Sequence, residues 1–186
     1  MQTDTTFPSR SLLYRVATYC YEFIELMAFT VMTVLLITTF FVRHSIVVGP
    51  SMDRTLAAGE HLIISDFMYT PKPGDIVVFD DEDLHYTTPL VKRVIAVEGQ
   101  TVRITHDSVF VDGVELDEPY VYTGDALPGY GYAPLEVTVP PGQLFVMGDH
   151  RNDSSDSRAF GTIDQRAVLG RVVLRVLPPR KFGRVE

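Results

Sequence analysis

The longest apolar run of the chain extends from Leu26 to Val42, 17 residues without a charged side chain, and two more apolar residues precede Glu25. At about 1.5 Å per helical residue, this run reaches about 26–30 Å, which matches the hydrocarbon core of a bilayer. Its threonines can donate to helix carbonyls, so they do not forbid insertion. A cleavable signal peptide has a shorter apolar segment and a small-residue cleavage site, which VRHSIVV does not offer. The sequence therefore predicts an uncleaved anchor over residues 23–43, after a short segment 1–22.

The charges restrict the partners of the chain but not its orientation. Two arginines flank each side of the apolar run, so the positive-inside rule gives a tie. The net charge of −8 lies in residues 44–186, because residues 1–43 hold equal numbers of arginines and acidic residues. This acidic body argues against nucleic acid as a main partner, since phosphate binding needs clustered cations. The single Cys20 precedes the run, so the body cannot form an internal disulfide.

Residues 44–186 have the pattern of a mainly β domain. Short runs rich in Val, Ile and Phe alternate with Gly- and Pro-containing turns, and no later segment has a long helical apolar period. The stretch 100–142 is rich in Gly, Pro and Tyr and is predicted to form a smaller lobe. We predict a β sandwich or an open barrel. The predicted strands lie in HLIIS, DIVVF, LVKRVIAV, VRITHDSVFV, LEVTV, LFVMG and GRVVLRVL.

Two residues are candidates for covalent chemistry: Ser51 in VVGPSMDRTL and Lys92 in PLVKRVIAV. GPSMD lacks the final glycine of a nucleophile elbow, and the five histidines show no triad spacing. Lys92 lies among β-branched residues. If it is buried, its pKa falls and its neutral amine can accept the proton of a serine hydroxyl. The alternative is a lysine on the outer face of an edge strand, where it deters aggregation.

A third stretch, FVMGDHRNDSSDSRAFGTID, concentrates charges of both signs after an apolar strand. It lacks the residue order of a calcium loop, and its arginines oppose a cation site. The sequence likewise has no zinc-protease or phosphate-loop motif, so we expect neither a metal nor a cofactor. We interpret the stretch as a buried ion-pair loop that fixes neighbouring strands. Its charged residues are Asp149, Arg151, Asp153, Asp156 and Arg158.

Together, PSMDRTL, GDIVVF, VKRVIAVEG and GDHRNDSSDSRAFG occur in the order and spacing of the bacterial type I signal peptidases, the Ser/Lys leader peptidases. The chain resembles this family from about Ser45 to Leu177, in its single-span Gram-positive form. The resemblance implies a mostly antiparallel β-sheet catalytic domain over residues 44–186 with a small second lobe. It also implies that this domain lies on the extracytoplasmic side of the cytoplasmic membrane and residues 1–22 on the cytoplasmic side.

The resemblance also implies roles for individual residues. Ser51 would be the nucleophile, Lys92 the general base and Ser154 the hydroxyl that orients the lysine. Gly49 and Ser51 would form the oxyanion region, although Gly49 replaces a serine whose hydroxyl some members use there. The supporting loop would comprise Asp149, Arg151, Asp156 and Arg158.

Three further residues depart from the family motif. Gln100 follows Gly99 after the lysine strand, where the family has a glycine-aspartate pair. Arg54 stands where S-M-x-P-T-L has proline, and His150 stands where asparagine follows Gly-Asp. Pro50 restricts its own φ and favours an extended Gly49 before it, which would hold Ser51 rigidly.

An extended substrate could add as a β-strand along residues 46–49 and 88–91, with shallow pockets for small side chains. The chain is therefore predicted to be a membrane-anchored serine endopeptidase that removes N-terminal signal peptides from exported preproteins, with the bilayer and the secretion machinery as partners. Two alternatives stay open: a Ser/Lys protease that matures pilus or conjugation proteins, and a silent homologue that acts as a binding or assembly subunit. The predicted substrate-binding residues are Ile46, Val47, Val48, Met52, Leu90 and Val91.

Overall fold

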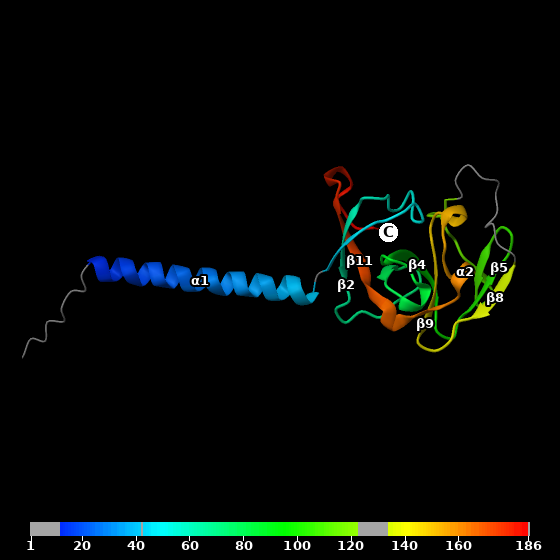
Figure 1. Cartoon of the computed structure of the whole chain (residues 1–186), viewed down its shortest axis with the longest axis horizontal. Helices are drawn as coiled ribbons and strands as arrows, with labels where there is room; N and C mark the ends of the chain where they lie inside the picture. The colour runs from blue at the N-terminus through cyan, green and yellow to red at the C-terminus, as the bar shows by residue number, and fades with distance from the viewer. Residues whose placement is uncertain (1–11, 42, 123–133, 186) are drawn as a thin grey trace, which may run out of the picture. The chain divides into compact units, whose positions relative to one another are not determined.

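The computed structural model describes residues 12–41, 43–122 and 134–185. The chain divides into two compact units, Met1–Phe40 and Phe41–Glu186, which are considered separately (Figure 1). The described part of the first unit belongs to helix α1 (Leu12–Phe41). Within it, Leu12–Ile37 is the one stretch of the described chain that is long and apolar enough to cross a membrane, judged by length and composition.

Helix α1 has the features that the apolar run predicts. Its apolar side chains from Leu12 to Ile37 are exposed, a pattern that a membrane-spanning helix would also have. The hydroxyls of Thr30 and Thr33 donate to the carbonyls of Leu26 and Phe29 at 2.8 and 2.9 Å, so these polar groups are satisfied within the helix. The helix already begins at Leu12, and the first eleven residues of the predicted leading segment lie outside the described residues.

The second unit is mainly β, as predicted. A seven-stranded sheet has the order β1-β2-β11-β3-β4-β9-β10, and all its ladders are antiparallel. In chain order its strands are β1 (Arg43–Ile46), β2 (His61–Ser65), β3 (Ile76–Phe79), β4 (Leu90–Val97), β9 (Gln143–Met147), β10 (Ile163–Asp164) and β11 (Val168–Leu177).

A four-stranded antiparallel sheet forms the small second lobe, in the order β7-β6-β5-β8. Its strands are β5 (Thr101–Ile104), β6 (Val109–Val111), β7 (Val114–Glu115) and β8 (Leu135–Thr138). The remaining elements are short: α2 (Ser157–Phe160), η1 (Glu82–Leu84), η2 (Arg151–Asp153), η3 (Gln165–Ala167) and η4 (Pro179–Lys181).

All seven predicted strand runs contain strands, with one correction. VRITHDSVFV is not one strand but a hairpin of β5 and β6, which turns where the Thr105 N–H donates to the Ser108 carbonyl at 2.9 Å. Strands β1, β7 and β10 were not predicted. These strands are short, and β1 and β7 are largely exposed, so they lack the apolar pattern that marked the others.

The large sheet is buried on both faces where it carries the candidate residues. Along β3, Ile76 and Val78 pack into one core cluster, whereas Val77 and Phe79 pack into another. A third cluster joins side chains of β4 and β9 to those of the small sheet. Strand β4 is therefore covered from Val91 to Ala96, which places its polar residues in the interior.

Candidate active site

The segment that carries Ser51 continues from β1 and ends in a tight turn. The Val47 N–H donates to the Glu60 carbonyl at 3.0 Å, which ties the start of the segment to the body. After Ser51, the Leu56 N–H donates to the Met52 carbonyl at 2.7 Å. Because Met52 and Leu56 are fully buried, they anchor the turn in the core, and Ser51 stays partly exposed at its start.

The backbone before Ser51 differs from the expectation. Gly49 does not have an extended φ but a φ of +81°, in the region that favours glycine. The preference that Pro50 imposes on its predecessor is a tendency of residues with a Cβ, and glycine is freer. A substitution at Gly49 would therefore strain the turn that presents the serine.

Lys92 lies in the middle of the covered part of β4. It pairs in register with Val77, and its neighbours along the same strand face, Leu90 and Val94, pack into the cluster that also contains Val77. Its side chain is only 2% exposed. The Lys92 Nζ donates to the Ser51 Oγ at 2.6 Å, so the structure brings the two candidates for chemistry into direct contact across 41 positions of sequence.

Burial lowers the pKa of Lys92 from 10.5 to about 8. The charges of Asp156 and Asp149 raise this pKa and that of Arg158 lowers it, but desolvation is the largest cause. A lysine with this pKa is partly neutral near neutral pH. Its lone pair can then accept the Ser51 hydroxyl proton, a change that makes the oxygen nucleophilic.

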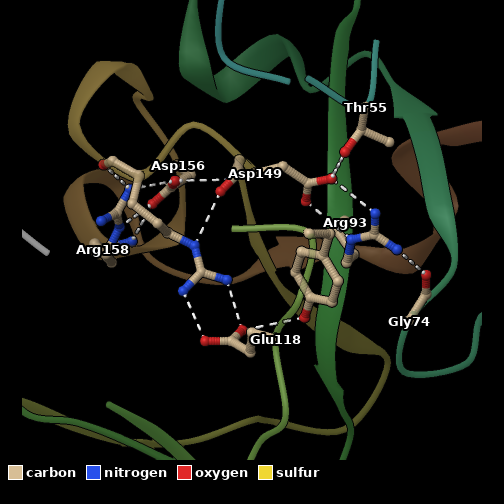
Figure 2. Close-up of polar contacts among 10 residues, drawn as sticks. Thr55, Gly74, Arg93, Glu118, Asp149, Asp156 and Arg158 are labelled. Atoms are coloured by element: carbon tan, nitrogen blue, oxygen red, sulfur yellow. Dashed lines mark hydrogen bonds and ion pairs between the residues drawn. The ribbon is translucent and has the colours of Figure 1, made fainter. Parts of the chain in front are cut away.

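A buried ion pair lies next to Lys92 on the same strand (Figure 2). Arg93 donates to both carboxylate oxygens of Asp149, at 2.9 and 2.7 Å, and to the Gly74 carbonyl at 3.0 Å. The Thr55 hydroxyl donates to the same carboxylate at 2.6 Å, and the Tyr120 ring covers the guanidinium at 3.8 Å. Asp149 thus joins the nucleophile turn to β4.

A second pair lies in the loop after β9. Arg158 donates to both carboxylate oxygens of Asp156, and neither side chain is exposed (Figure 2). The hydrogen bonds and charge of Arg158 lower the pKa of Asp156 although burial opposes this, so the group is a carboxylate. The same carboxylate accepts from the Gly148 N–H at 2.9 Å and from the Ser154 hydroxyl at 2.7 Å. Arg151 pairs instead with Glu118, at 2.6 and 2.9 Å.

This loop contacts the nucleophile directly at two points. A Cβ on Gly148 would lie 2.5 Å from the Ser51 carbonyl oxygen and would also collide with the Ser154 side chain, so only glycine fits. Two residues later, the His150 N–H donates to the Ser51 carbonyl at 3.0 Å. The Ser51 carbonyl is therefore fixed by the hydrogen bond from His150 and by close packing against Gly148.

The structure places the other predicted site residues as follows. Ser154 donates to Asp156, and the described residues include no hydrogen bond between Ser154 and Lys92. Ile46 and Val48 are 47% and 65% exposed, and Leu90 is half-buried. Val47, Met52 and Val91 are buried in one core cluster.

Sequence reasoning missed four residues that hold the site together: Thr55, Arg93, Glu118 and Tyr120. Arg93 follows Lys92 directly, so a second cation in a strand of apolar residues was a signal for a buried counter-charge. Glu118 and Tyr120 lie in a stretch that was assigned only to a smaller lobe, and nothing in their local pattern connects them to the loop after β9.

Two backbone edges are available beside the Ser51–Lys92 contact. Strand β1 is the outermost strand of the large sheet, so one of its edges has no strand partner in the described part of the chain. Strand β4 pairs with β3 from Leu90 onward but with β9 only from Arg93 onward. The backbone from Leu90 to Lys92 therefore has a second edge without a strand partner among the described residues.

The fold and the contact define a chemical arrangement: a serine hydroxyl and a buried amine of lowered pKa, presented by a mainly antiparallel β domain. The model of the family "Signal peptidase, peptidase S26" matches residues 20–177. The chain belongs to this family and is a peptidase.

Individual relatives agree with this assignment. Over 173 residues the chain is 34% identical to the probable signal peptidase I-1 of Synechocystis sp., covering 88% of this chain and 86% of that protein. It is 36% identical over 169 residues to the signal peptidase I of Bacillus licheniformis, covering 81% and 84%. Among solved structures, a signal peptidase I from Enterococcus faecalis matches with a TM-score of 0.49 and 30% identity, over 56% of this chain and 98% of that one.

Proposed function

We propose that this chain is a membrane-anchored endopeptidase that removes signal peptides from exported preproteins, with Ser51 as nucleophile and Lys92 as general base. The observation that carries the proposal is the 2.6 Å contact between the Lys92 Nζ and the Ser51 Oγ. A lysine that is merely structural would pair with a carboxylate or reach solvent, as Lys181 does on Glu60. Family membership supports the reaction class.

The proposed reaction follows the usual order of serine hydrolases. Neutral Lys92 accepts the Ser51 proton as the oxygen attacks the carbonyl carbon of the scissile peptide bond, and a tetrahedral oxyanion forms. The ammonium of Lys92 then donates this proton to the leaving nitrogen, and the C–N bond breaks to leave an ester on Ser51. Neutral Lys92 next accepts a proton from water as the water oxygen attacks the ester carbonyl carbon. The Lys92 ammonium then returns this proton to the Ser51 oxygen as the ester C–O bond breaks, which releases the second product as a carboxylic acid and restores the serine hydroxyl.

Backbone donors suit the developing oxyanion. The Ser51 N–H makes no hydrogen bond within the described part of the chain, so it is free to donate to that oxygen. Gly49 has no side chain, so it cannot supply the hydroxyl donor that some family members have at this position. A second hydrogen-bond donor to the oxyanion must come from another residue. His150 holds the Ser51 carbonyl at 3.0 Å, and this contact fixes the orientation of the peptide unit that follows Ser51.

The proposed substrate is an extended peptide that adds along the open edges near residues 46–49 and 88–91. Backbone hydrogen bonds to such edges bind any sequence, and side-chain pockets then select among sequences. Ile46 and Val48 are exposed apolar residues on the first of these segments, and Leu90 begins the second. We assign these residues, with the buried Val47, Met52 and Val91 behind them, to the substrate subsites.

Helix α1 is proposed as the anchor that keeps the β domain at the extracytoplasmic face of the cytoplasmic membrane. Ser51 follows the apolar run by nine positions, which allows the chain at most about 30 Å of reach. A translocated preprotein presents its cleavage point close to the bilayer surface, where a site on so short a tether would meet it. The lipid bilayer and the secretion machinery are the partners that this placement implies.

The test uses the purified full chain in detergent and a preprotein with a cleavable signal peptide. We expect the wild type to cleave at the signal-peptide boundary and Ser51→Ala to leave the preprotein intact. Ser155→Ala is the matched control, because Ser155 is an exposed serine whose hydroxyl oxygen accepts a hydrogen bond from Tyr86 and does not contact the Ser51–Lys92 pair in the described structure. A folded wild type without turnover would indicate a silent homologue, and cleavage only of pilus-type precursors would change the substrate class.

A further inference from the structure

The two residues that depart from the family motif near Ser51 meet on one aromatic ring. The guanidinium of Arg54 lies 4.2 Å from the centroid of the Tyr122 ring. The His150 ring lies 4.7 Å from the same ring, with an angle of 36° between the planes. Arg54 and His150 are 96 positions apart in the sequence. No local sequence pattern therefore indicates that these two departures from the family motif lie on the same ring.

His150 contacts the backbone on both sides of the proposed nucleophile. Its N–H donates to the Ser51 carbonyl at 3.0 Å, and its Nδ1 lies 3.3 Å from the Pro50 carbonyl. A carbonyl can only accept, so this contact needs the proton on Nδ1. The two bonds make His150 a clamp on the peptide units that flank the Ser51 side chain.

Tyr122 holds His150 in place through its backbone as well as its ring. The Tyr122 N–H donates to the Asp149 carbonyl and its own carbonyl accepts from the Arg151 N–H, each at 2.8 Å. Residue 150 is thus bracketed by two hydrogen bonds from Tyr122. The Tyr122 ring also contacts the guanidinium of Arg54, which belongs to the nucleophile turn.

The backbone conformation of Arg54 is strained. Its φ is +73°, a left-handed value that a side chain with a Cβ adopts only at a cost. Proline, with its φ held near −65°, cannot adopt this conformation at all. The turn seen here is therefore not the one that the proline motif would build, and the cation–π contact with Tyr122 offsets the strain of the left-handed residue.

We propose that Arg54, Tyr122 and His150 form a positioning stack that fixes the turn Pro50–Leu56 and so sets the geometry of Ser51. None of the three touches the reacting atoms, so they are positioning residues. This proposal rests on the proposed role of Ser51 as nucleophile. A displaced nucleophile loses rate in the chemical step more than it loses peptide binding, so the stack should affect kcat and leave KM nearly unchanged.

The main variants separate the ring from the hydroxyl. Tyr122→Leu should lower kcat for a signal-peptide substrate about tenfold with KM within about twofold of wild type, whereas Tyr122→Phe, which keeps the ring, should retain nearly full kcat. Phe110→Leu is the matched control, because the guanidinium of Arg103 lies over that ring at the same 4.2 Å, in the small sheet. It should leave kcat unchanged.

Arg54→Gly distinguishes the stack from simple backbone strain. Glycine accepts the left-handed φ freely, so if strain alone mattered the variant would equal or exceed the wild type. We expect a fall in kcat of about threefold instead, and no further fall when the change is made in Tyr122→Leu, because the two changes remove one interaction. Additive losses, or an unchanged kcat in Tyr122→Leu, would overturn the proposal.

A measurement that does not use turnover keeps this proposal separate from the proposed function. In the folded full chain, the amides of Asp53 and Leu56 donate within the turn at 2.9 and 2.7 Å. Tyr122→Leu should speed the hydrogen exchange of these amides at least about tenfold over wild type, while amides of the small sheet keep their rates. Exchange that is unchanged contradicts the stack even if the wild type cleaves preproteins, and faster exchange supports it even if Ser51 proves inactive.

Discussion

Lys92 and Arg93 are consecutive residues of β4, 2% and 4% exposed, and their surroundings differ completely. Arg93 donates to both carboxylate oxygens of Asp149 and to a backbone carbonyl, and an aromatic ring covers its face. Lys92 has one hydrogen-bond partner in the described part of the chain, the neutral hydroxyl of Ser51. Strand β4 thus carries two adjacent cationic residues, of which Arg93 has a carboxylate counter-charge in contact and Lys92 has none.

The presence or absence of a counter-charge decides whether a buried cationic residue has a structural role or can act as a base. A guanidinium cannot lose its proton in a protein, so burying it requires a counter-charge, and Asp149 provides one. An amine can become neutral, and burial without a carboxylate in contact lowers its pKa to about 8. The uncompensated residue is the one that can serve as a base, and its compensated neighbour joins the nucleophile turn to the sheet.

The largest expected effect comes from making Lys92 permanently charged or permanently neutral. Lys92→Arg and Lys92→Met should each reduce turnover at least about 10⁴-fold, because neither side chain can accept the Ser51 proton. Lys92→Met should keep or raise the melting temperature, since an apolar side chain replaces an amine whose burial is costly. Peptide kinetics and thermal melts check both statements. A Lys92→Arg protein that cleaves near the wild-type rate would exclude the general-base role.

Removing the counter-charge of Arg93 should affect stability more than chemistry, the reverse of the Lys92 variants. Asp149→Ala leaves the buried guanidinium of Arg93 without its counter-charge and should lower the free energy of unfolding by about 3–5 kcal/mol. Asp156→Ala should act similarly through Arg158. Denaturant melts measure the loss, and activity should be compared at a temperature where each variant is folded. If Asp149→Ala were as stable as wild type, the pair would not be the structural support that its geometry indicates.

The contrast also predicts a pH dependence that belongs to Lys92 alone. Its pKa is about 8 in the folded chain and 10.5 when unperturbed, so between these values the unfolded state binds a proton that the folded state does not. Stability therefore rises with pH across this window, by about 3 kcal/mol in total, relative to a Lys92→Met variant measured in parallel.

The same ionisation should appear in the activity of the enzyme. Turnover should rise about tenfold per pH unit below pH 8 and level off above it, since only the neutral amine can act as base. A stability difference between wild type and Lys92→Met that is flat from pH 8 to 10.5 would show that the Lys92 pKa is not lowered by folding.

The sequence was informative where a pattern is local. The length of the uncharged apolar run predicted α1, and the runs of branched residues predicted the longer strands, because burial on one or both faces of a strand leaves a direct trace in the sequence. The edge strand β1 left no such trace, since it is held by β2 and is largely exposed. The hairpin between β5 and β6 was missed because its turn contains neither Gly nor Pro, although Asp107 and Ser108 are residues that favour turns.

The candidate site shows the same limit more strongly. Ser51 and Lys92 could be selected by motif, but their contact spans 41 positions and depends on how the sheet curls. The charged loop after β9 was predicted as one ion-pair unit, yet the Arg151 guanidinium pairs with Glu118, which lies outside that loop. Which acid neutralises which arginine is decided by tertiary packing, and one sequence does not contain that pairing as a local signal.

A smaller loss of activity than at Lys92 is expected at Ser154. The resemblance places this serine beside the lysine, whereas in the structure its hydroxyl donates to Asp156 at 2.7 Å. Removing its hydroxyl would leave the Asp156 carboxylate with fewer donors and loosen the Gly148 backbone, which packs against the Ser51 carbonyl. Ser154→Ala should therefore lower kcat about tenfold without abolishing activity, because it shifts the nucleophile and removes no reacting group.

Ser155→Ala is the control for this change, since it removes a neighbouring hydroxyl that meets only Tyr86 in the described structure, at 2.8 Å. It should change kcat by less than about twofold, as an exposed hydrogen bond contributes little. The two variants also separate the two possible roles of Ser154. If Ser154 acts through Asp156, the pH at which turnover levels off stays near 8, because desolvation of Lys92 is unchanged. If it acts on the amine directly, that pH moves with the substitution, and the contact with Asp156 would then be incidental to catalysis.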